Sequence, residues 1–139
     1  FLNHKVKKAD VLSDLTSIPE GVLPENKFYL GIYDVDNLVA IADVVLNFPT
    51  SKTAWLGLIM VDYDAVGQGI GGKIIEKLKQ ALMRERFKQL CTLVPIESDV
   101  GSFFDAHGFL TGEEMPMGVR GDGCEIVGKL KTVDLNIIK

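Results

Sequence analysis

The sequence predicts a domain of the α/β (α+β) class, in which a sheet with antiparallel neighbouring strands is flanked by helices. Apolar runs of strand length lie in the middle of the chain, and a glycine-rich turn followed by an amphipathic helix comes after them. The chain has 139 residues, of which 47% are apolar. A chain of this size buries roughly two-thirds of its unfolded surface, so we expect a single domain over residues 1–139.

The composition argues against several classes of partner. The formal net charge is −4, with acidic and basic residues interspersed, so no basic field attracts nucleic acid or an anionic membrane. No apolar stretch approaches the roughly 20 residues that cross a bilayer, and residues 1–5 do not form a signal peptide. We expect neither nucleic acid nor a membrane as a partner.

The two cysteines, Cys91 and Cys124, each lie within an apolar run. Neither has CxxC spacing or clustered histidines nearby, so both are interpreted as small buried thiols and not as a disulfide or a metal site. Free thiols indicate a reducing compartment. We therefore expect a cytoplasmic protein with no metal.

The first half of the chain predicts one helix and three strands. Residues 7–18 carry apolar side chains at helical spacing and end before Pro19. The apolar runs 27–33 and 38–46 flank a short turn and predict an antiparallel hairpin. Residues 53–61 (TAWLGLIMV) are apolar nearly throughout, which is typical of a central strand covered on both faces.

A glycine-rich turn follows this central strand. Residues 67–72 (GQGIGG) hold four glycines, and the next segment repeats apolar residues at helical spacing, at Ile70, Ile74, Ile75, Leu78 and Leu82. Glycines let the backbone approach a ligand closely, and the free N–H groups of a first helical turn favour an anion. A phosphate is the natural ligand, although the same glycines also suit a tight turn that packs a helix on a sheet.

The turn also satisfies the dinucleotide-binding pattern G-x-G-x-x-G through Gly67, Gly69 and Gly72. That motif belongs directly after the first strand of a series of βαβ units. Here five residues separate it from the strand, and the preceding strands are expected to be antiparallel. The context argues against a dinucleotide site.

The remaining chain predicts a strand at 89–96, a helix at 98–106 and a final pair of strands at 109–119 and 123–133. The sequence Arg-Gly-Asp-Gly at 120–123 has the composition of a hairpin turn.

Two motifs resemble the GNAT superfamily of acetyl-CoA-dependent N-acetyltransferases. Residues 66–71 (VGQGIG) align with its Q/R-x-x-G-x-G/A motif, and residues 98–109 (SDVGSFFDAHGF) resemble its N-x-x-A-x-x-F-Y-x-x-x-G-F helix and turn. The resemblance covers about Val11 to the C-terminus. It implies the GNAT fold, with a mixed, mostly antiparallel twisted sheet that splays between the strands at 53–61 and 89–96.

By the same resemblance, a strand and a helix normally precede the helix at 7–18, and they form much of the acceptor wall. Only a few residues stand there in this sequence. We expect the chain to lack that N-terminal strand and helix.

The resemblance also implies where acetyl-CoA binds. The pantetheine arm would pair with the end of the central strand, where one backbone N–H polarises the thioester carbonyl, and the pyrophosphate would lie on the glycine turn. The residues expected to contact acetyl-CoA are Ile59, Met60, Val61, Val66, Gly67, Gln68, Gly69, Ile70, Gly71, Gly72, Lys73 and Phe104.

Three residues depart from the family pattern. Val66 replaces the usual Gln or Arg but leaves the backbone donors in place. Glu97 stands where Asn is usual, and Phe104 stands where many members have the Tyr that protonates the leaving thiolate. The identity of the general acid is therefore left open.

The implied reaction is direct acetyl transfer to an amine, either a small molecule or a protein amine, and family members also form homodimers. A base is needed because such an amine is mostly protonated near neutral pH. Glu97 and Asp43 are the candidates for the catalytic base. Asp43 is also compatible with a solvent-facing strand residue. A CoA-binding sensor or scaffold without transfer activity is the alternative function.

Overall fold

The computed structural model describes residues 2–3, 26–34, 36–62, 67, 69–98, 100–119 and 121–135. The helix predicted at 7–18 lies outside these residues. In chain order the elements are β1 (Leu2–Asn3), β2 (Lys27–Asp34), β3 (Asn37–Leu46), β4 (Thr53–Val61), α2 (Ile70–Arg84), β5 (Gln89–Pro95), α3 (Val100–Ala106), β6 (Leu110–Val119) and β7 (Glu125–Asp134). Every element predicted within the described range is present, with boundaries shifted by at most two residues.

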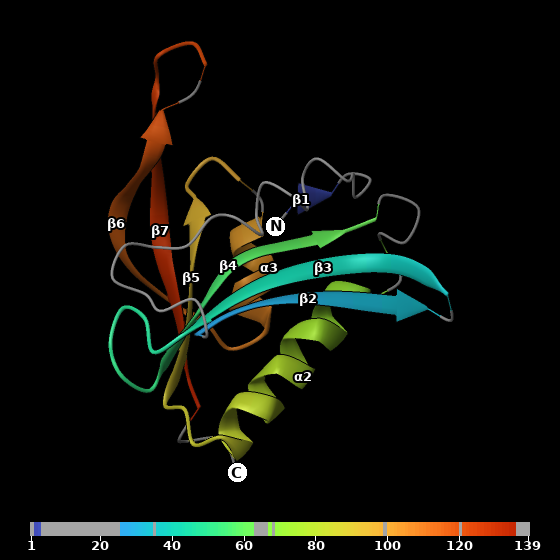
Figure 1. Ribbon diagram of the computed structural model, residues 1–139. Coiled ribbons are helices and arrows are strands. Elements are labelled where there is room, and N and C mark those ends of the chain that lie inside the picture. Colours follow the sequence, from blue (N-terminus) through green and yellow to red (C-terminus); the bar gives the residue numbers. More distant parts are fainter. Residues whose placement is uncertain are drawn as a thin grey trace.

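The strands form one mixed, twisted sheet in the order β2-β3-β4-β5-β7-β6, with β1 beside β4 (Figure 1). Among the described pairs, β4 runs parallel to β5 and to β1, and the other neighbours are antiparallel. The predicted α/β class and the mostly antiparallel sheet are confirmed. No helix in the described part of the chain is long and apolar enough to span a membrane.

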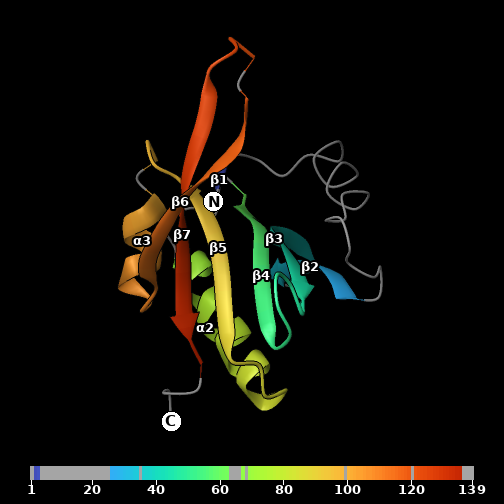
Figure 2. The same cartoon turned by 90° about the vertical axis from the view of Figure 1, so that its left-hand side faces the viewer.

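Both described helices cover the same face of the sheet (Figure 2). Alternate residues of β3 and β4 meet the apolar side of α2 and Phe104 of α3 in one core. The largest fully buried members of this core are Phe104, Leu56, Ile59, Ile75, Leu90 and Val61.

A polar cluster joins α2 to the end of α3. The Lys79 ammonium group donates to the backbone oxygen of His107 at 2.9 Å and lies 3.2 Å from the Glu76 carboxylate. His107 Nδ1 lies 2.7 Å from the same carboxylate, and this hydrogen bond, with a smaller contribution from Lys79, holds the pKa of Glu76 below its usual value. These contacts with the end of α3 bury Lys79.

A bulge in β4 adds one residue opposite β3. Asp43 pairs with Leu58, whereas its neighbour Val44 pairs with Leu56, so Gly57 is the extra residue. In a regular strand, side chains three positions apart point to opposite faces. The extra residue shifts the in–out alternation of side chains by one position. Apolar residues on both sides of the bulge therefore point into the same core, namely Ala54, Leu56, Ile59 and Val61.

The strands β4 and β5 separate at this bulge. Residues 53–56 pair with residues 89–92, and the Thr92 hydroxyl donates a 2.8 Å hydrogen bond to the carbonyl oxygen of Leu56 at the last paired position. Beyond it β4 turns away while β5 continues beside β7 (Figure 1). The predicted splay is confirmed.

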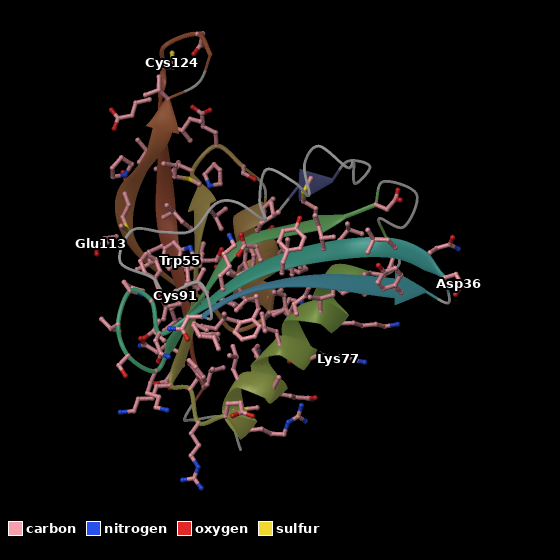
Figure 3. All side chains as sticks on the ribbon, viewed as in Figure 1. Asp36, Trp55, Lys77, Cys91, Glu113 and Cys124 are labelled. Atoms are coloured by element: carbon pink, nitrogen blue, oxygen red, sulfur yellow. The ribbon has the colours of Figure 1, made fainter. Side chains whose placement is uncertain are left out.

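The hairpin of β6 and β7 extends past the rest of the sheet, and its tip carries Cys124 (Figure 3). Cys124 is exposed, so its interpretation as a buried thiol is wrong. It follows the 121–123 turn, at a point where no other described element covers the hairpin. Cys91 in β5 is buried as predicted, and burial raises the pKa of its thiol.

Candidate functional site

The gap between β4 and β5 is lined by backbone groups of β4. The Asp62 N–H donates to the Val39 carbonyl oxygen, which fixes the alternation of hydrogen bonds between β3 and β4. Alternate residues of β4 point the same way as Asp62, so Leu58 and Met60 direct their N–H groups to β3. Ile59 and Val61 direct theirs into the gap. Of the three residues predicted to contact the thioester arm, Met60 therefore presents its backbone to β3.

The short strand β1 lies within this gap. Its two residues pair with Met60 and Val61 in parallel. Because β3 occupies the other edge of β4, β1 takes the edge that faces β5 (Figure 1). Ile59 lies between the bulge and this contact, and among the described strands no residue lies opposite its gap-facing N–H.

The glycine turn follows the diverging end of β4 in the chain and leads into α2. Gly67 has φ +90° and Gly69 has φ +76°, a left-handed conformation that glycine adopts without strain. A β-carbon on either residue would have no atom within 4 Å among its described surroundings. Gly69 is the N-cap of α2, and the first turn of this helix carries no acidic residue. Its free N–H groups and open approach suit an anion.

The other predicted residues of the turn have different surroundings. A β-carbon on Gly72 would lie 3.1 Å from His107 Nε2, so this glycine lets α2 approach the end of α3. Gly71 is buried, Ile70 is half-buried, and Lys73 is exposed one turn into the helix. Val66 and Gln68 lie outside the described residues.

Phe104 lies in the core beneath the sheet. Only 1% of its surface is exposed, and its ring packs edge-on against Phe103 and Phe109 at centroid distances of 5.1 and 5.2 Å. The motif position was predicted to contact the ligand, but the ring supports the sheet.

Glu97 is exposed just after the end of β5, the strand that borders the gap opposite β4. Glu97 lines a pocket of about 320 Å³. The rest of the lining consists of apolar residues from the end of β5 and the start of β7, and of a second carboxylate, Glu125 of β7. The Ile96 N–H donates to the Val127 carbonyl oxygen at 3.0 Å and holds the end of β5 against β7. A cation with an apolar part fits such a lining.

Asp43 lies on the opposite face of the sheet from α2. It is only 6% exposed, which excludes the interpretation as a solvent-facing residue. Its Oδ2 accepts a 2.7 Å hydrogen bond from the Lys27 ammonium group, and its Oδ1 has no hydrogen-bond partner among the described residues. Asp43 and Glu97 are on different elements and in different surroundings.

Two features of the site escaped the sequence reasoning. Gly57 interrupts an apolar strand, and an isolated glycine in a strand is a known signal of a bulge. Thr92 is the last residue of β5 that pairs with β4, but nothing in its local sequence indicates the contact with Leu56. Among the described residues, no cluster of three or more His, Cys, Asp or Glu side chains could hold a metal ion.

A strand that diverges from its parallel neighbour, followed by a glycine turn and a helix, defines a known class of fold. The profile of the acetyltransferase (GNAT) family matches residues 7–109 of the chain. The chain belongs to this family, as its two motifs predicted. No curated protein sequence matches the chain.

Solved structures of acetyltransferases share the fold. The chain matches the ribosomal-protein-S18-alanine N-acetyltransferase of Escherichia coli with a TM-score of 0.72 and 16% identity, over 97% of this chain and 94% of that one. It matches an acetyltransferase of Thermus thermophilus with a TM-score of 0.64 and 20% identity, over 78% of this chain and 64% of that one.

A third match is the PaiA N-acetyltransferase of Thermoplasma acidophilum, whose structure is a complex with coenzyme A. The TM-score is 0.57 and the identity 14%, over 75% of this chain and 60% of that one. The chain thus spans less than two-thirds of the Thermus and Thermoplasma proteins. At these identities the matches establish the fold.

Proposed function

We propose that this chain is an N-acetyltransferase that transfers the acetyl group of acetyl-CoA directly to an amine in the cytoplasm. The observation that carries the proposal is that β4 separates from β5 beyond Leu56 and is followed along the chain by the glycine turn that begins α2. Between the bulge and the residues that pair with β1, the gap suits a pantetheine arm, which can pair with backbone groups as a strand does. The turn suits the pyrophosphate, because free N–H groups and an open glycine surface meet there.

The thioester carbonyl would lie near Ile59. As the amine nitrogen forms its bond to the carbonyl carbon, negative charge develops on the carbonyl oxygen. The gap-facing N–H of Ile59 can donate to this oxygen as a single-donor oxyanion hole. The carbon–sulfur bond then breaks, the sulfur takes up a proton, and the amide loses one. Holding both substrates together supplies much of the rate.

Glu97 is the better placed of the two candidate bases. It is exposed beyond the end of β5, where an amine can reach it from solvent. Asp43 is only 6% exposed, so an amine in solvent does not reach its carboxylate. We assign proton removal to Glu97. The acceptor is a small-molecule or protein amine, and the pocket beside Glu125 suits a cation with an apolar part.

A second function is favoured by Phe104. This residue stands where the family resemblance places the Tyr that protonates the leaving thiolate, and it carries no proton to donate. Its ring also lies in the core. A module that binds CoA as a sensor or scaffold, without transfer, would need no such acid.

Calorimetric titration with acetyl-CoA, and with NAD in a parallel run, tests the ligand. Binding of acetyl-CoA alone supports the proposal, whereas binding of NAD alone contradicts it. Release of free thiol in a screen of amines then separates the enzyme from the sensor.

The role of Glu97 is tested once turnover is found. Glu97→Gln should lower kcat and flatten the acidic limb of the pH profile, because the amide cannot accept the proton. Glu113→Gln, on the exposed β6 strand, is the matched control (Figure 3). An unchanged profile for Glu97→Gln would refute its assignment as the base.

A further inference from the structure

The side chain of His107, at the end of α3, lies against the first turn of α2. Its Nε2 atom is 3.1 Å from the place that a β-carbon on Gly72 would occupy, so the imidazole ring lies directly beside the backbone of that turn. The first helical hydrogen bond runs from the Lys73 N–H to the Gly69 carbonyl oxygen, so Gly72 carries the last N–H group without a helical partner. The ring therefore borders the N–H groups that we assign to the pyrophosphate of acetyl-CoA.

Glu76 fixes the orientation of this ring. Its Oε2 lies 2.7 Å from Nδ1 of His107, and Glu76 is one helical turn after Gly72 on the same side of α2. On α3 the ring packs against Phe103 at a centroid distance of 5.0 Å. The side chain of His107 is 22% exposed, so solvent can still deliver a proton to it. With Nδ1 held by the carboxylate, Nε2 faces the first turn of α2.

His107 is the group that can change the net charge of this cluster. Among the described residues, the charged side chains that face it are Glu76 and Lys79, both from α2. The hydrogen bond from His107 holds the pKa of Glu76 below its usual value, so Glu76 stays ionised near neutral pH. Asp105, on α3, is paired instead with Lys131 of β7. Glu76 and Lys79 sum to zero charge, and protonation of His107 brings the cluster to +1.

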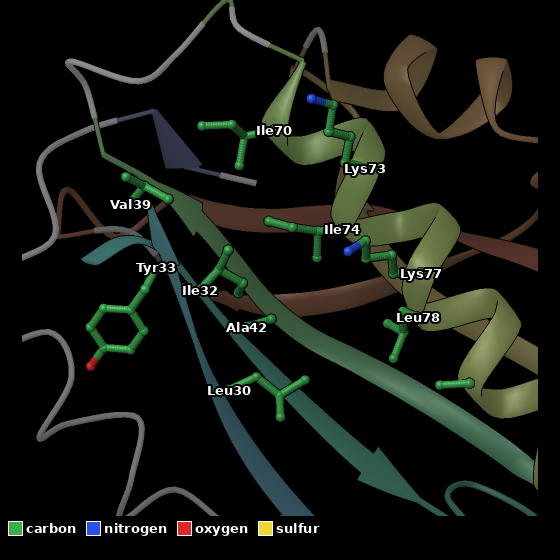
Figure 4. A pocket seen from close by; sticks show the side chains of 11 residues that line it. Leu30, Ile32, Tyr33, Val39, Ala42, Ile70, Lys73, Ile74, Lys77 and Leu78 are labelled. Carbon is green, nitrogen blue, oxygen red and sulfur yellow. The ribbon is translucent and has the colours of Figure 1, made fainter. Parts of the chain in front are cut away.

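The other cations near the start of α2 lie on a different side of the helix. Lys73 and Lys77 line a groove with Leu30 and Ile32 of β2 (Figure 4). A lysine side chain ordinarily keeps its charge near neutral pH, whereas a histidine side chain ordinarily changes its charge between about pH 5 and 8. These lysines can attract an anion, but they do not make that attraction depend on pH in this range.

We propose that protonated His107 supplies a positive charge that strengthens the binding of acetyl-CoA, a role that rests on the proposed function. The imidazole takes up a proton from solvent as the pyrophosphate binds. By linkage, protonation raises the affinity for the anion by the same factor by which the anion raises the affinity for the proton. The affinity for acetyl-CoA therefore falls as the pH rises through the range in which His107 loses its charge.

A purely structural role for His107 makes a different prediction. The bond to Glu76 would then serve only to hold α3 on α2. The backbone oxygen of His107 also accepts a 2.9 Å hydrogen bond from Lys79, so part of this contact persists whatever side chain stands at position 107. A neutral side chain that bonds to Glu76 would replace a structural histidine at every pH, but it would not replace a charge.

Calorimetric titration with acetyl-CoA over a range of roughly pH 5.5–8.5 tests the proposal, because histidine changes its charge there. The unaltered chain is compared with His107→Gln, whose amide can donate to Glu76 but carries no charge. A pyrophosphate on the first turn would lie roughly 6–8 Å from Nε2, since the helix rises about 1.5 Å per residue. At an effective dielectric of about 40–80, the unaltered chain should bind roughly 5- to 50-fold more tightly than His107→Gln at acidic pH. At alkaline pH the two should bind equally. Ionisation of the ligand's own phosphate is common to both proteins and cancels in this ratio.

Two lysine variants separate local charge from general charge. His107→Lys keeps a cation at this position, so its affinity relative to that of His107→Gln should stay raised at alkaline pH. Ala106→Lys adds a cation at an exposed position of the same helix and should keep the pH profile of the unaltered chain. In buffers of different ionisation enthalpy, the unaltered chain should take up a fraction of a proton on binding acetyl-CoA, and His107→Gln should take up less.

The protonation of His107 can also be followed without a substitution at that position. The chain has two histidines, so His4→Gln assigns their imidazole signals in NMR spectra. The titration midpoint of the His107 signal should rise when acetyl-CoA is bound. A midpoint that does not rise, or parallel pH profiles for the unaltered chain and a folded His107→Gln, would overturn the role of His107 while leaving the acetyl-CoA site in place. Absence of acetyl-CoA binding at every pH would refute the proposed function and this role together.

Discussion

The glycine turn can be tested by placing a negative charge on it and comparing the result with a neutral residue of the same shape. Gly69→Asp and Gly69→Asn differ only in charge, and both residues tolerate a positive φ better than other side chains do. At Gly69, φ is +76° and a β-carbon meets no described atom, so neither side chain should disturb the fold.

The expected difference follows from Coulomb's law. A carboxylate on Gly69 would lie about 6 Å from a pyrophosphate on the first turn of α2, and an effective dielectric of about 40–80 suits this exposed position. Each phosphate charge then costs about 0.7–1.4 kcal/mol, and two charges cost about 1.4–2.8 kcal/mol. Gly69→Asp should bind acetyl-CoA roughly 10- to 100-fold more weakly than Gly69→Asn.

The assay is calorimetric titration of both variants with acetyl-CoA at low and at high salt, and the difference should shrink as salt screens the charges. Gly123 provides the control pair, because it has φ +86° and the same open surroundings but lies in the turn between β6 and β7. Gly123→Asp and Gly123→Asn should bind equally. If the Asp and Asn variants at Gly69 also bound with equal affinity, the turn would not be the phosphate site.

Three further predictions concern stability and reactivity. Lys27→Met should destabilise the protein by about 3–5 kcal/mol, because it leaves Asp43 buried without its cation, and adding Asp43→Leu should recover most of the loss in chemical denaturation. Glu76→Gln should lower the free energy of unfolding near neutral pH. The pKa of Glu76 is lowered in the folded state, so the carboxylate stabilises the protein above its ordinary pKa of 4.5, and this stabilisation is lost as the pH falls through the lower, folded-state pKa. The free energy of unfolding of Glu76→Gln should therefore fall less on acidification than that of the unaltered protein. In titration with a chromogenic disulfide, Cys124 should react quickly and Cys91 only slowly, because Cys124 is exposed and burial raises the pKa of Cys91; two equally fast thiols would contradict this.

Most of the sheet could be predicted because it depends on local periodicity. The run at 53–61 forms β4 with the predicted bounds, and the helix begins at Ile70 directly after the glycines. The splay was an inference from family motifs, and the structure supplies its physical setting, a bulge at Gly57 where pairing with β5 ends.

The surroundings of polar side chains could not be predicted in the same way. Asp43 is buried because the hairpin register brings Lys27 to it from 16 residues away. Lys79 is buried because His107, at the end of another helix, presents a carbonyl oxygen to it. Neither contact can be inferred from the residues that neighbour Asp43 or Lys79 along the chain.

Because of the bulge, the opening in the sheet depends on how many residues β4 contains and not on which side chains they carry. No side-chain substitution within 53–61 changes how many residues lie between the part of β4 that pairs with β5 and the part that diverges. Removing Gly57 would do so, but it would also turn Ile59 and Val61 out of the core that they share with Leu56. The gap is therefore coupled to the core: point substitutions can alter what it accepts, whereas closing it would require a deletion that the fold resists.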